Sequence, residues 1–229
     1  MKTGPKGSDG RVGAKAALFD LDGTLIDSER RSLVLWGLLL TNHGVDHDET
    51  LLREFMGRRG PDVLAEKATL FPGRRVEDLL AELISYLDRP GLPEISPVPG
   101  AADLIRRIDG HGLPVVLVTS AHRWWAESCL ELVGVGDVVR TIVSAEDVTV
   151  GKPDPSGFLL GARAAGVRPG ECVAFEDSLA GIAAAKAAGM TCVGVATTHH
   201  ASELSAADLV VSDLAGVDWP LPLYGDFPV

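Results

Sequence analysis

The sequence predicts an α/β protein with a doubly wound, Rossmann-like parallel sheet as its core and an inserted domain made only of helices. Two observations predict this fold. Short apolar runs that end in polar residues alternate with helical patterns over most of the chain, and one long stretch has consecutive helical patterns with no strand between them. Alternating strands and helices give a parallel sheet covered on both faces. A long strand-free stretch indicates a separate helical insert.

Six apolar runs have the length of buried strands, and polar residues follow each of them. The six runs are residues 16–19, 115–118, 140–143, 172–175, 192–195 and 209–211. Helical patterns at 101–108, 124–133, 155–165 and 179–188 separate most of these runs. Several of the helical patterns end at glycine, a common helix terminator. This order of elements predicts strands joined by helices, as in a doubly wound sheet.

Residues 29–94 interrupt the alternation. Helical patterns in this stretch lie at 31–42, 48–56, 61–68 and 76–88, and a run rich in Pro and Gly follows them. Such a run is typical of a linker between domains. We therefore expect residues 15–28 and 95–229 to form the core and residues 29–94 to form the helical insert, with a hinge and helix N-cap at Asp27 and Ser28. Residues 1–14 lack periodicity and are predicted to be a mobile tail.

The composition narrows the class of protein. The chain has 229 residues, a formal net charge of −11 and 46% hydrophobic residues, as expected of a globular protein with a sizeable core. The negative charge gives no reason to expect binding to nucleic acid or to an anionic membrane. No apolar run has the pattern of a secretory signal or the length of about 20 residues that crosses a bilayer. We expect a cytoplasmic protein, a monomer or weak dimer, in which Cys129, Cys172 and Cys192 are buried free thiols.

Polar side chains follow four of the predicted strands. Asp20 and Asp22 follow the first strand, Thr119 and Ser120 follow the second, Lys152 lies in the loop after the third, and Glu176 and Asp177 follow the fourth. The carboxyl ends of parallel strands meet at one edge of the sheet, where ligands bind. Carboxylates that crowd at the edge of an apolar core bind a hard cation, and a ligand set of oxygens alone favours Mg²⁺ over zinc. The sequence therefore predicts a magnesium site at this edge.

These side chains fit the roles that phosphoryl transfer requires: an in-line nucleophile, positive charge around the phosphoryl oxygens and an acid for the leaving oxygen. Asp20 is the candidate nucleophile. Asp22, two residues later, is the candidate acid that protonates the leaving oxygen and then deprotonates water. Lys152 and Thr119 are predicted to hold the phosphoryl oxygens and Asp177 to bind Mg²⁺. The predicted reaction is hydrolysis of a small phosphate ester through an aspartyl-phosphate on Asp20.

Four segments of the sequence resemble the four motifs of the haloacid dehalogenase superfamily. They are Phe-Asp-Leu-Asp-Gly-Thr-Leu-Ile-Asp-Ser at 19–28, Val-Thr-Ser-Ala at 118–121, Gly-Lys-Pro-Asp-Pro at 151–155 and Phe-Glu-Asp-Ser-Leu-Ala-Gly at 175–181. Their order and spacing match that superfamily, and the resemblance covers roughly residues 16–212. The insert at 29–94 is similar to the small helical cap that the superfamily carries after its first motif.

The resemblance implies a role for each motif residue. Asp20 would be the nucleophile and a metal ligand, Asp22 the acid–base residue and a metal ligand through its carbonyl oxygen, and Asp177 a metal ligand. Glu176 would either share the metal through water or orient the loop. The phosphate-binding residues would be Thr119, Ser120, Lys152 and, from the cap, Arg58. Arg58 follows a glycine between two cap helices, where it would lean over the site on cap closure or lie in a solvated loop.

The resemblance also narrows the reaction. Dehalogenases and phosphonate hydrolases of the superfamily lack a carboxylate where this chain has Asp22, which favours phosphate ester chemistry. The motifs look most like those of sugar-phosphate and glycerol-phosphate phosphatases, so a sugar or polyol phosphate is the expected substrate class. A beta-phosphoglucomutase is the alternative, but those mutases carry His where Ser32 aligns and Arg where Gly60 aligns. A non-catalytic protein with the same fold is a third interpretation, and the complete set of motif residues counts against it.

Two pairs of aromatic or imidazole side chains lie near the predicted site. Trp124 and Trp125 begin a predicted helix, where packing is favoured over stacking on a sugar ring. His199 and His200 follow a strand but have no third partner for a metal site, so we expect them to be surface residues.

Overall fold

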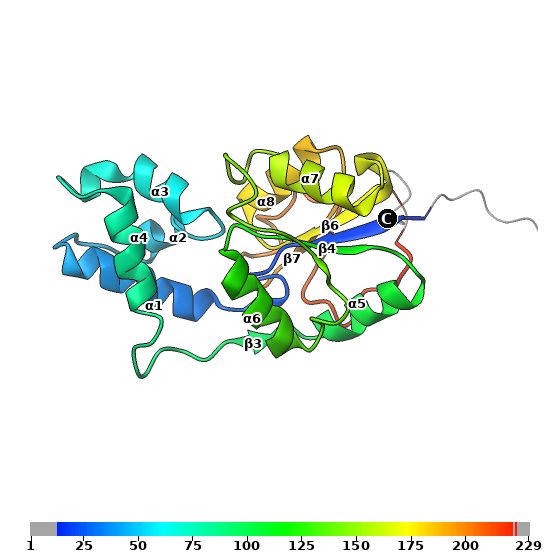
Figure 1. Ribbon diagram of the computed structural model, residues 1–229, viewed down its shortest axis with the longest axis horizontal. Coiled ribbons are helices and arrows are strands. Elements are labelled where there is room, and N and C mark those ends of the chain that lie inside the picture. The colour runs from blue at the N-terminus through cyan, green and yellow to red at the C-terminus, as the bar shows by residue number, and fades with distance from the viewer. Residues whose placement is uncertain (1–12, 222, 224–229) are drawn as a thin grey trace, which may run out of the picture.

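Six parallel strands form the central sheet of the computed structural model, which describes residues 13–221 and residue 223 (Figure 1). The strands are β1 (Ala16–Phe19), β4 (Val115–Val118), β5 (Thr141–Val143), β6 (Cys172–Glu176), β7 (Thr191–Val195) and β8 (Leu209–Val211). Their spatial order is β5-β4-β1-β6-β7-β8, so β1 lies inside the sheet with later strands on both sides. All six predicted strands are confirmed, with ends that differ by at most one residue.

Helices cover both faces of the sheet. The core helices are α5 (Ala101–Gly110), α6 (Arg123–Val133), α7 (Ser156–Ala165) and α8 (Leu179–Ala187). Alternate residues of β1 point to opposite faces, because side chains in a strand repeat every two residues. Ala17 and Phe19 pack in the same cluster as residues of α5 and α6, whereas Ala16 and Leu18 pack with α7 and α8. Figure 1 shows these two layers of helices with the sheet between them, which confirms the predicted fold class.

The register of the sheet brings the predicted site residues to one edge. Phe19 in β1 pairs with Leu117 in β4 on one side and with Phe175 in β6 on the other. The rings of Phe19 and Phe175 stack with centroids 4.4 Å apart. The residues that follow the three strands therefore leave the sheet next to one another.

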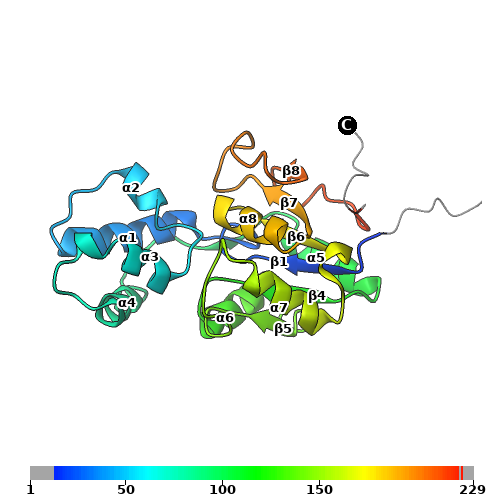
Figure 2. The ribbon, with the colours of Figure 1, turned by 90° about the horizontal axis from the view of Figure 1, so that it is seen from above.

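The helices that follow the first strand lie together beside the core (Figures 1 and 2). They are α1 (Glu29–Asn42), α2 (Glu49–Arg53), α3 (Gly60–Glu66), the 3₁₀ turn η1 (Ala68–Leu70) and α4 (Val76–Ser85). These helices have an apolar cluster of their own, which includes Leu39, Phe55, Leu64 and Phe71. An inserted cap domain requires an apolar cluster of its own. The domain boundaries at residues 29 and 94 stay a prediction.

Three of the cap helices end earlier than predicted. The pattern at 61–68 gives a helix that ends at Glu66. The pattern at 48–56 gives a helix only over Glu49–Arg53. The helix begins after Asp48, which is its N-cap and accepts a hydrogen bond from the Leu51 amide at 2.9 Å. After this helix the chain turns through Gly57, which has φ +67°. The pattern at 76–88 gives a helix that ends at Ser85.

The two chain crossings between core and cap are tied together by a small ribbon that the sequence does not predict. Strands β2 (Ile26–Asp27) and β3 (Ser96–Pro97) pair antiparallel. Each strand is too short to show a periodic pattern, which is why the sequence gives only linkers here. The ribbon holds the start of α1 close to the loop that contains Asp22.

The described part of the chain starts inside the predicted N-terminal tail. Residues 1–12 of that tail lie outside the described residues. Ala14, however, is buried in the core and its amide donates to the carbonyl of Leu221 at 3.3 Å, so the predicted tail extends too far at its C-terminal end. Among the residues that the structure describes, no helix is both long enough and apolar enough to cross a bilayer.

Candidate active site

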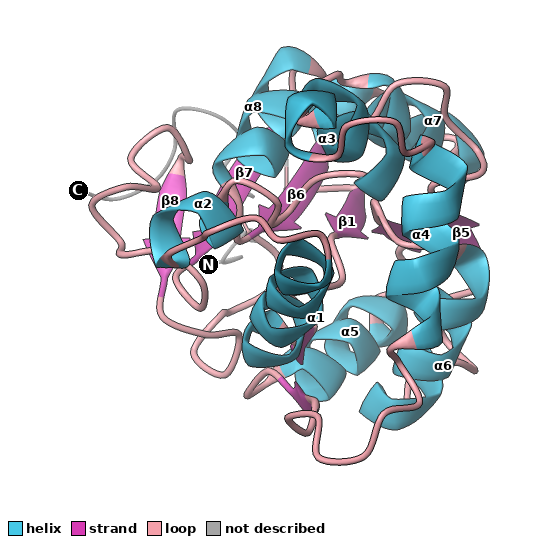
Figure 3. Cartoon of the chain, turned by 90° about the vertical axis from the view of Figure 1, so that its left-hand side faces the viewer, coloured by secondary structure: helices cyan, strands magenta, loops and turns pink. Residues whose placement is uncertain are grey.

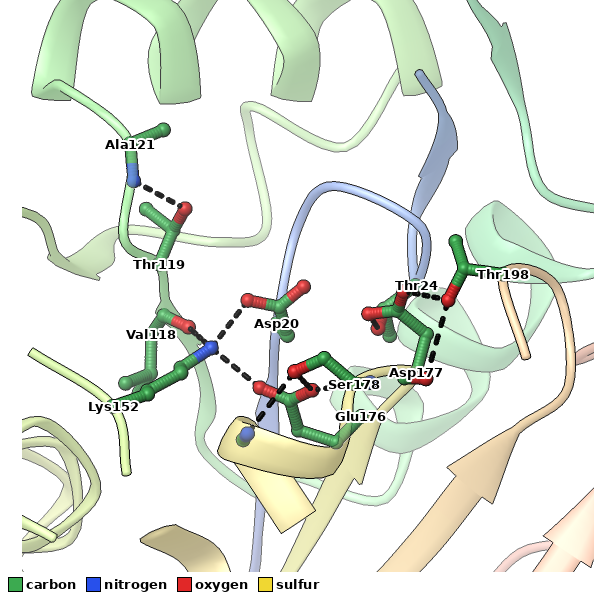
Figure 4. Close-up of polar contacts among 11 residues, drawn as sticks. Asp20, Thr24, Val118, Thr119, Ala121, Lys152, Glu176, Asp177, Ser178 and Thr198 are labelled. Atoms are coloured by element: carbon green, nitrogen blue, oxygen red, sulfur yellow. Dashed lines mark hydrogen bonds and ion pairs between the residues drawn. The ribbon is translucent and has the colours of Figure 1, made fainter. Parts of the chain in front are cut away.

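The predicted site residues meet at the carboxyl edge of the sheet (Figure 4). Asp20 directly follows β1, Thr119 follows β4, and Glu176 is the last residue of β6. Carboxylate oxygens of Asp20, Glu176 and Asp177 all lie within 4.8 Å of one another. All three carboxylates are buried. One divalent ion with ligand distances near 2 Å can therefore contact this cluster.

The Lys152 ammonium group lies against two of these carboxylates. It donates to Asp20 Oδ1, to Glu176 Oε1 at 2.5 Å and to the carbonyl oxygen of Val118 at 3.1 Å. Burial lowers the pKa of Lys152, but Asp20 and Glu176 more than reverse that effect, so the pKa lies above its ordinary value. Lys152 thus stays charged and supplies positive charge directly beside the candidate nucleophile.

Asp177 is held by two threonine hydroxyls. Thr24 Oγ1 donates to Asp177 Oδ1 at 3.2 Å, and Thr198 Oγ1 donates to Asp177 Oδ2 at 2.5 Å. Burial, with the charge of Glu176 as a second cause, raises the pKa of Asp177 to about 7. These bonds fix the direction of a carboxylate that faces the cluster.

The cluster contains more negative than positive charge. Burial raises the pKa of Asp20 well above its ordinary value; Glu176 and Asp177 raise it further, and Lys152 opposes them. Three buried carboxylates share one ammonium group. Such a set either holds protons or binds a cation. The all-oxygen donors and the excess charge fit a divalent metal ion.

Asp22 lies in the loop after β1 and is held on one oxygen. Its Oδ1 accepts a hydrogen bond from Ser28 Oγ at 2.7 Å and one from Trp125 Nε1 at 3.3 Å. Burial raises the pKa of Asp22, and the two hydrogen bonds oppose that rise. A carboxyl group whose pKa is raised retains a proton closer to neutral pH, as an acid for a leaving group requires.

Thr119 and Ser120 lie beside the cluster but do not cap α6. Thr119 Oγ1 accepts from the Ala121 amide at 3.0 Å, and the N-cap of α6 is His122. Both Thr119 and Ser120 line the cavity above Asp20. The loop after β4 therefore brings Thr119 and Ser120 to the wall of the cavity beside Asp20.

A cavity of about 240 Å³ lies between the carboxylate cluster and the cap. Its core side includes Asp20, Asp22 and Asp177, and its cap side includes Leu80, Leu83 and Ile84. In Figure 3, seen from the cap side, the cap helices lie in front of the sheet. Arg58 also lines this cavity, and its guanidinium group donates to Glu66 at 2.6 Å. The geometry thus places Arg58 near the site without bringing it to the carboxylate cluster.

The cap is joined to the core by polar contacts on two sides of the cavity. Asp62 Oδ2 accepts from the Gly151 amide at 3.0 Å, next to Lys152. Arg53 donates to the carbonyl oxygen of Thr198 at 3.1 Å, next to the hydroxyl that holds Asp177. Both contacts end on the loops that carry the site, so cap position and site geometry are linked.

Several residues of the site have roles that sequence reasoning missed. Thr24, Thr198, Ser28 and Trp125 each donate to a site carboxylate. Thr24 lies inside the first motif and Thr198 follows a strand, so the sequence positions of both residues could have indicated that they lie in the site. His199 was expected at the surface, but it is half-buried, lines the cavity and lies 2.9 Å from Thr198 Oγ1 through its Nδ1.

The three cysteines behave as predicted. Cys129, Cys172 and Cys192 are buried and free. Burial raises the pKa of Cys129 to about 12. None of these thiols belongs to the carboxylate cluster, so they are structural residues of the core.

The doubly wound sheet, the buried acidic cluster with its lysine and the helical cap together are typical of a phosphoryl-transfer enzyme with a Rossmann-like core. A family model described as haloacid dehalogenase-like hydrolase matches residues 14–189. The chain belongs to this family.

Relatives of the chain include named phosphatases. It is 42% identical over 206 residues to validoxylamine A 7'-phosphate phosphatase of Streptomyces hygroscopicus subsp. limoneus, an alignment that covers 90% of this chain and 97% of the relative. It is 32% identical over 202 residues to hexitol phosphatase A of Escherichia coli K12, covering 87% of this chain and 91% of the relative. The solved structure of a hydrolase from Pseudomonas syringae matches with a TM-score of 0.79 at 26% identity, over 88% of this chain and 94% of that one.

Proposed function

We propose that this chain is a magnesium-dependent phosphomonoesterase that hydrolyses a small phosphorylated sugar or polyol through an aspartyl-phosphate on Asp20. The observation that supports it is the meeting of Asp20, Lys152 and Asp177, two of which, Asp20 and Asp177, line the cavity between core and cap. A nucleophile, a fixed cation and a metal-binding carboxylate are the groups that phosphoryl transfer requires.

The proposed reaction has two steps on one nucleophile. In the first step an Asp20 carboxylate oxygen attacks phosphorus, the bond from phosphorus to the ester oxygen breaks, and Asp22 gives its proton to that oxygen as the alcohol leaves. In the second step a water molecule attacks the aspartyl-phosphate and gives a proton to Asp22. The bond between phosphorus and Asp20 then breaks, phosphate leaves, and both aspartates return to their starting states.

The cation site is proposed at Asp20, Asp177 and the backbone carbonyl of Asp22. When bound, Mg²⁺ supplies positive charge at the phosphoryl oxygens. Both oxygens of Glu176 already have partners: Oε1 accepts from Lys152 at 2.5 Å, and Oε2 accepts from the Ser178 amide at 3.1 Å. We assign Glu176 to orienting Lys152 and to adding negative charge near the ion.

Three side chains are proposed to hold the phosphate. Thr119 and Ser120 line the cavity beside Asp20, and Lys152 lies against Asp20 itself. Arg58 is proposed to contact the substrate only after its hydrogen bond to Glu66 breaks.

The substrate class is proposed from the relatives. Two of them are named a validoxylamine A 7'-phosphate phosphatase and a hexitol phosphatase, which supports a sugar or polyol phosphate. The cap supplies Leu80, Leu83 and Ile84 to the wall of the cavity that faces the leaving group. The protein is proposed to act as a monomer or weak dimer in the cytoplasm.

The experiment that tests this function is a panel of phosphorylated sugars, polyols and aryl alcohols with Mg²⁺, scoring free phosphate and isomerised sugar. We expect phosphate release that stops on chelation of the metal. Asp20→Asn is expected to lower kcat by at least about 1000-fold with an unchanged circular dichroism spectrum. Asp109→Asn, on the exposed end of α5, is the matched control. Isomerisation without net phosphate release would instead indicate a mutase, and full activity of Asp20→Asn would exclude the covalent mechanism.

A further inference from the structure

Two adjacent tryptophans at the start of α6 line the same cavity but have different contacts. Trp125 Nε1 donates to Asp22 Oδ1 at 3.3 Å. Trp124 is 46% exposed and lies edge-on to Trp125, with ring centroids 5.9 Å apart at 74°. Of the two tryptophans, Trp125 is the one that forms the hydrogen bond to Asp22.

The two hydrogen bonds to Asp22 come from opposite parts of the molecule. Ser28, the N-cap residue of α1, donates from the hinge that leads into the cap. Trp125 donates from α6, which is anchored in the core through Ala126, Cys129 and Leu130. The indole therefore ties the Asp22 side chain to a rigid core element, independently of where the cap lies.

Both bonds end on the same oxygen. Since Oδ1 accepts two donors at 2.7 and 3.3 Å, its lone pairs face Ser28 and Trp125. A proton on Asp22 is then expected on Oδ2, because Oδ1 accepts from the indole N–H, which can only donate, and from the Ser28 hydroxyl as donor. The orientation of the carboxyl group decides whether that proton can reach the leaving oxygen, since proton transfer needs heavy atoms within hydrogen-bond distance.

We infer that Trp125 is a positioning residue for acid catalysis: its indole N–H holds Oδ1 of Asp22, so that Oδ2 carries the proton to the leaving alkoxide. This inference rests on the proposed phosphatase function. It assigns Trp125 a role beyond packing in the core and gives the neighbouring Trp124 no part in proton transfer.

If Trp125 has this role, the loss of rate on removing its N–H depends on the leaving group of the substrate. An alkoxide needs a proton as it leaves, whereas p-nitrophenolate leaves without one. A misplaced Asp22 therefore slows the first step, formation of the aspartyl-phosphate, much more for an alkyl phosphate than for p-nitrophenyl phosphate. The second step, in which Asp22 takes a proton from water, is the same for both substrates. A merely structural role for Trp125 would slow both substrates by the same factor.

The test compares Trp125→Phe with Trp124→Phe, using p-nitrophenyl phosphate and the alkyl phosphate that wild type hydrolyses with the highest kcat/KM. We expect Trp125→Phe to lower the single-turnover rate constant for alcohol release from the alkyl phosphate at least about 10-fold, a part of the ~10²–10⁴ that a general acid contributes. With p-nitrophenyl phosphate the same rate constant should fall less than about threefold. Trp124→Phe is expected to change KM for either substrate and to leave the ratio of the two single-turnover rate constants unchanged.

A second variant keeps the test valid if Trp125→Phe does not fold. Benzothienylalanine at position 125 replaces the indole N–H by sulfur and keeps the shape of the ring, so it should reproduce the selective loss. An equal loss in the single-turnover rate constant on both substrates, or a ratio of these rate constants like that of wild type in both position-125 variants, would overturn the inference while phosphatase activity itself remained. If wild type released phosphate from none of the substrates, the proposed function would fail, and this inference with it.

Discussion

Replacing Lys152 by methionine would test the charge balance of the carboxylate cluster most directly. The ammonium group is buried and contacts Asp20, Glu176 and the Val118 carbonyl. Methionine fills most of the same space without charge or donors. The variant therefore leaves Asp20, Glu176 and Asp177 close together with no positive partner in the cluster.

The expected loss of stability follows from that burial. Removing one partner of a buried ion pair costs about 3–5 kcal/mol, because the remaining charge is uncompensated. For a chain of this size, that corresponds to a fall in Tm of roughly 6–20 °C. Mg²⁺ should restore part of the loss, since a more negative cluster binds the ion more tightly. Tenfold tighter binding adds about 1.4 kcal/mol of stability at saturating Mg²⁺.

Urea denaturation of both proteins, in EDTA and in saturating MgCl₂, measures these differences. Lys15→Met is the matched control, because Lys15 pairs with Glu171 at 2.7 Å but its side chain is 53% exposed. The control should lose less than about 1 kcal/mol and show no extra dependence on Mg²⁺. A Lys152→Met protein within about 1 kcal/mol of wild type in EDTA would refute the claim that Lys152 neutralises this cluster.

Two further substitutions test the metal ligand and the cap. Gly23→Ala should weaken activation by Mg²⁺, because a Cβ at this residue, which has φ +86°, would overlap the Asp177 carboxylate. Gly44→Ala is the control: this residue has φ +67° and open space around it, so alanine imposes similar backbone strain there. The control should leave the activation constant for Mg²⁺ unchanged. Asp62→Ala should raise KM about fivefold with little change in kcat, since it removes about 1 kcal/mol of hydrogen bonding to the Gly151 amide that helps to hold the cap closed. Steady-state kinetics at varied Mg²⁺ and substrate check both expectations, and unaltered constants would contradict them.

The sequence predicts the strands and the groups at their ends because both depend on local signals. Buried parallel strands are short and wholly apolar, and the first polar residue after each run marks the sheet edge. Asp20, Thr119 and Asp177 follow such runs directly. The spatial order β4-β1-β6 then brings these residues together, as the strand reversal of a doubly wound sheet leads one to expect.

The contacts that orient these groups could not be predicted in the same way. Asp22 and Trp125 are 103 residues apart, and their hydrogen bond depends on the rotation of α6 about its axis. A periodic pattern shows which face of a helix is apolar, but Trp125 and Trp124 occupy adjacent positions of one amphipathic turn. Which indole faces Asp22 is decided by how α6 packs on the sheet, and this requires coordinates.

The charge of the cluster also constrains how a substrate can bind. A phosphate monoester is itself negative, and it must approach three carboxylates that share one ammonium group in a buried site. Lys152 alone cannot offset that repulsion, because its donors already contact Asp20 and Glu176. A divalent cation at Asp20 and Asp177 would both neutralise the cluster and attract the phosphate. The metal is therefore needed for the ester to bind, before any bond to phosphorus forms or breaks.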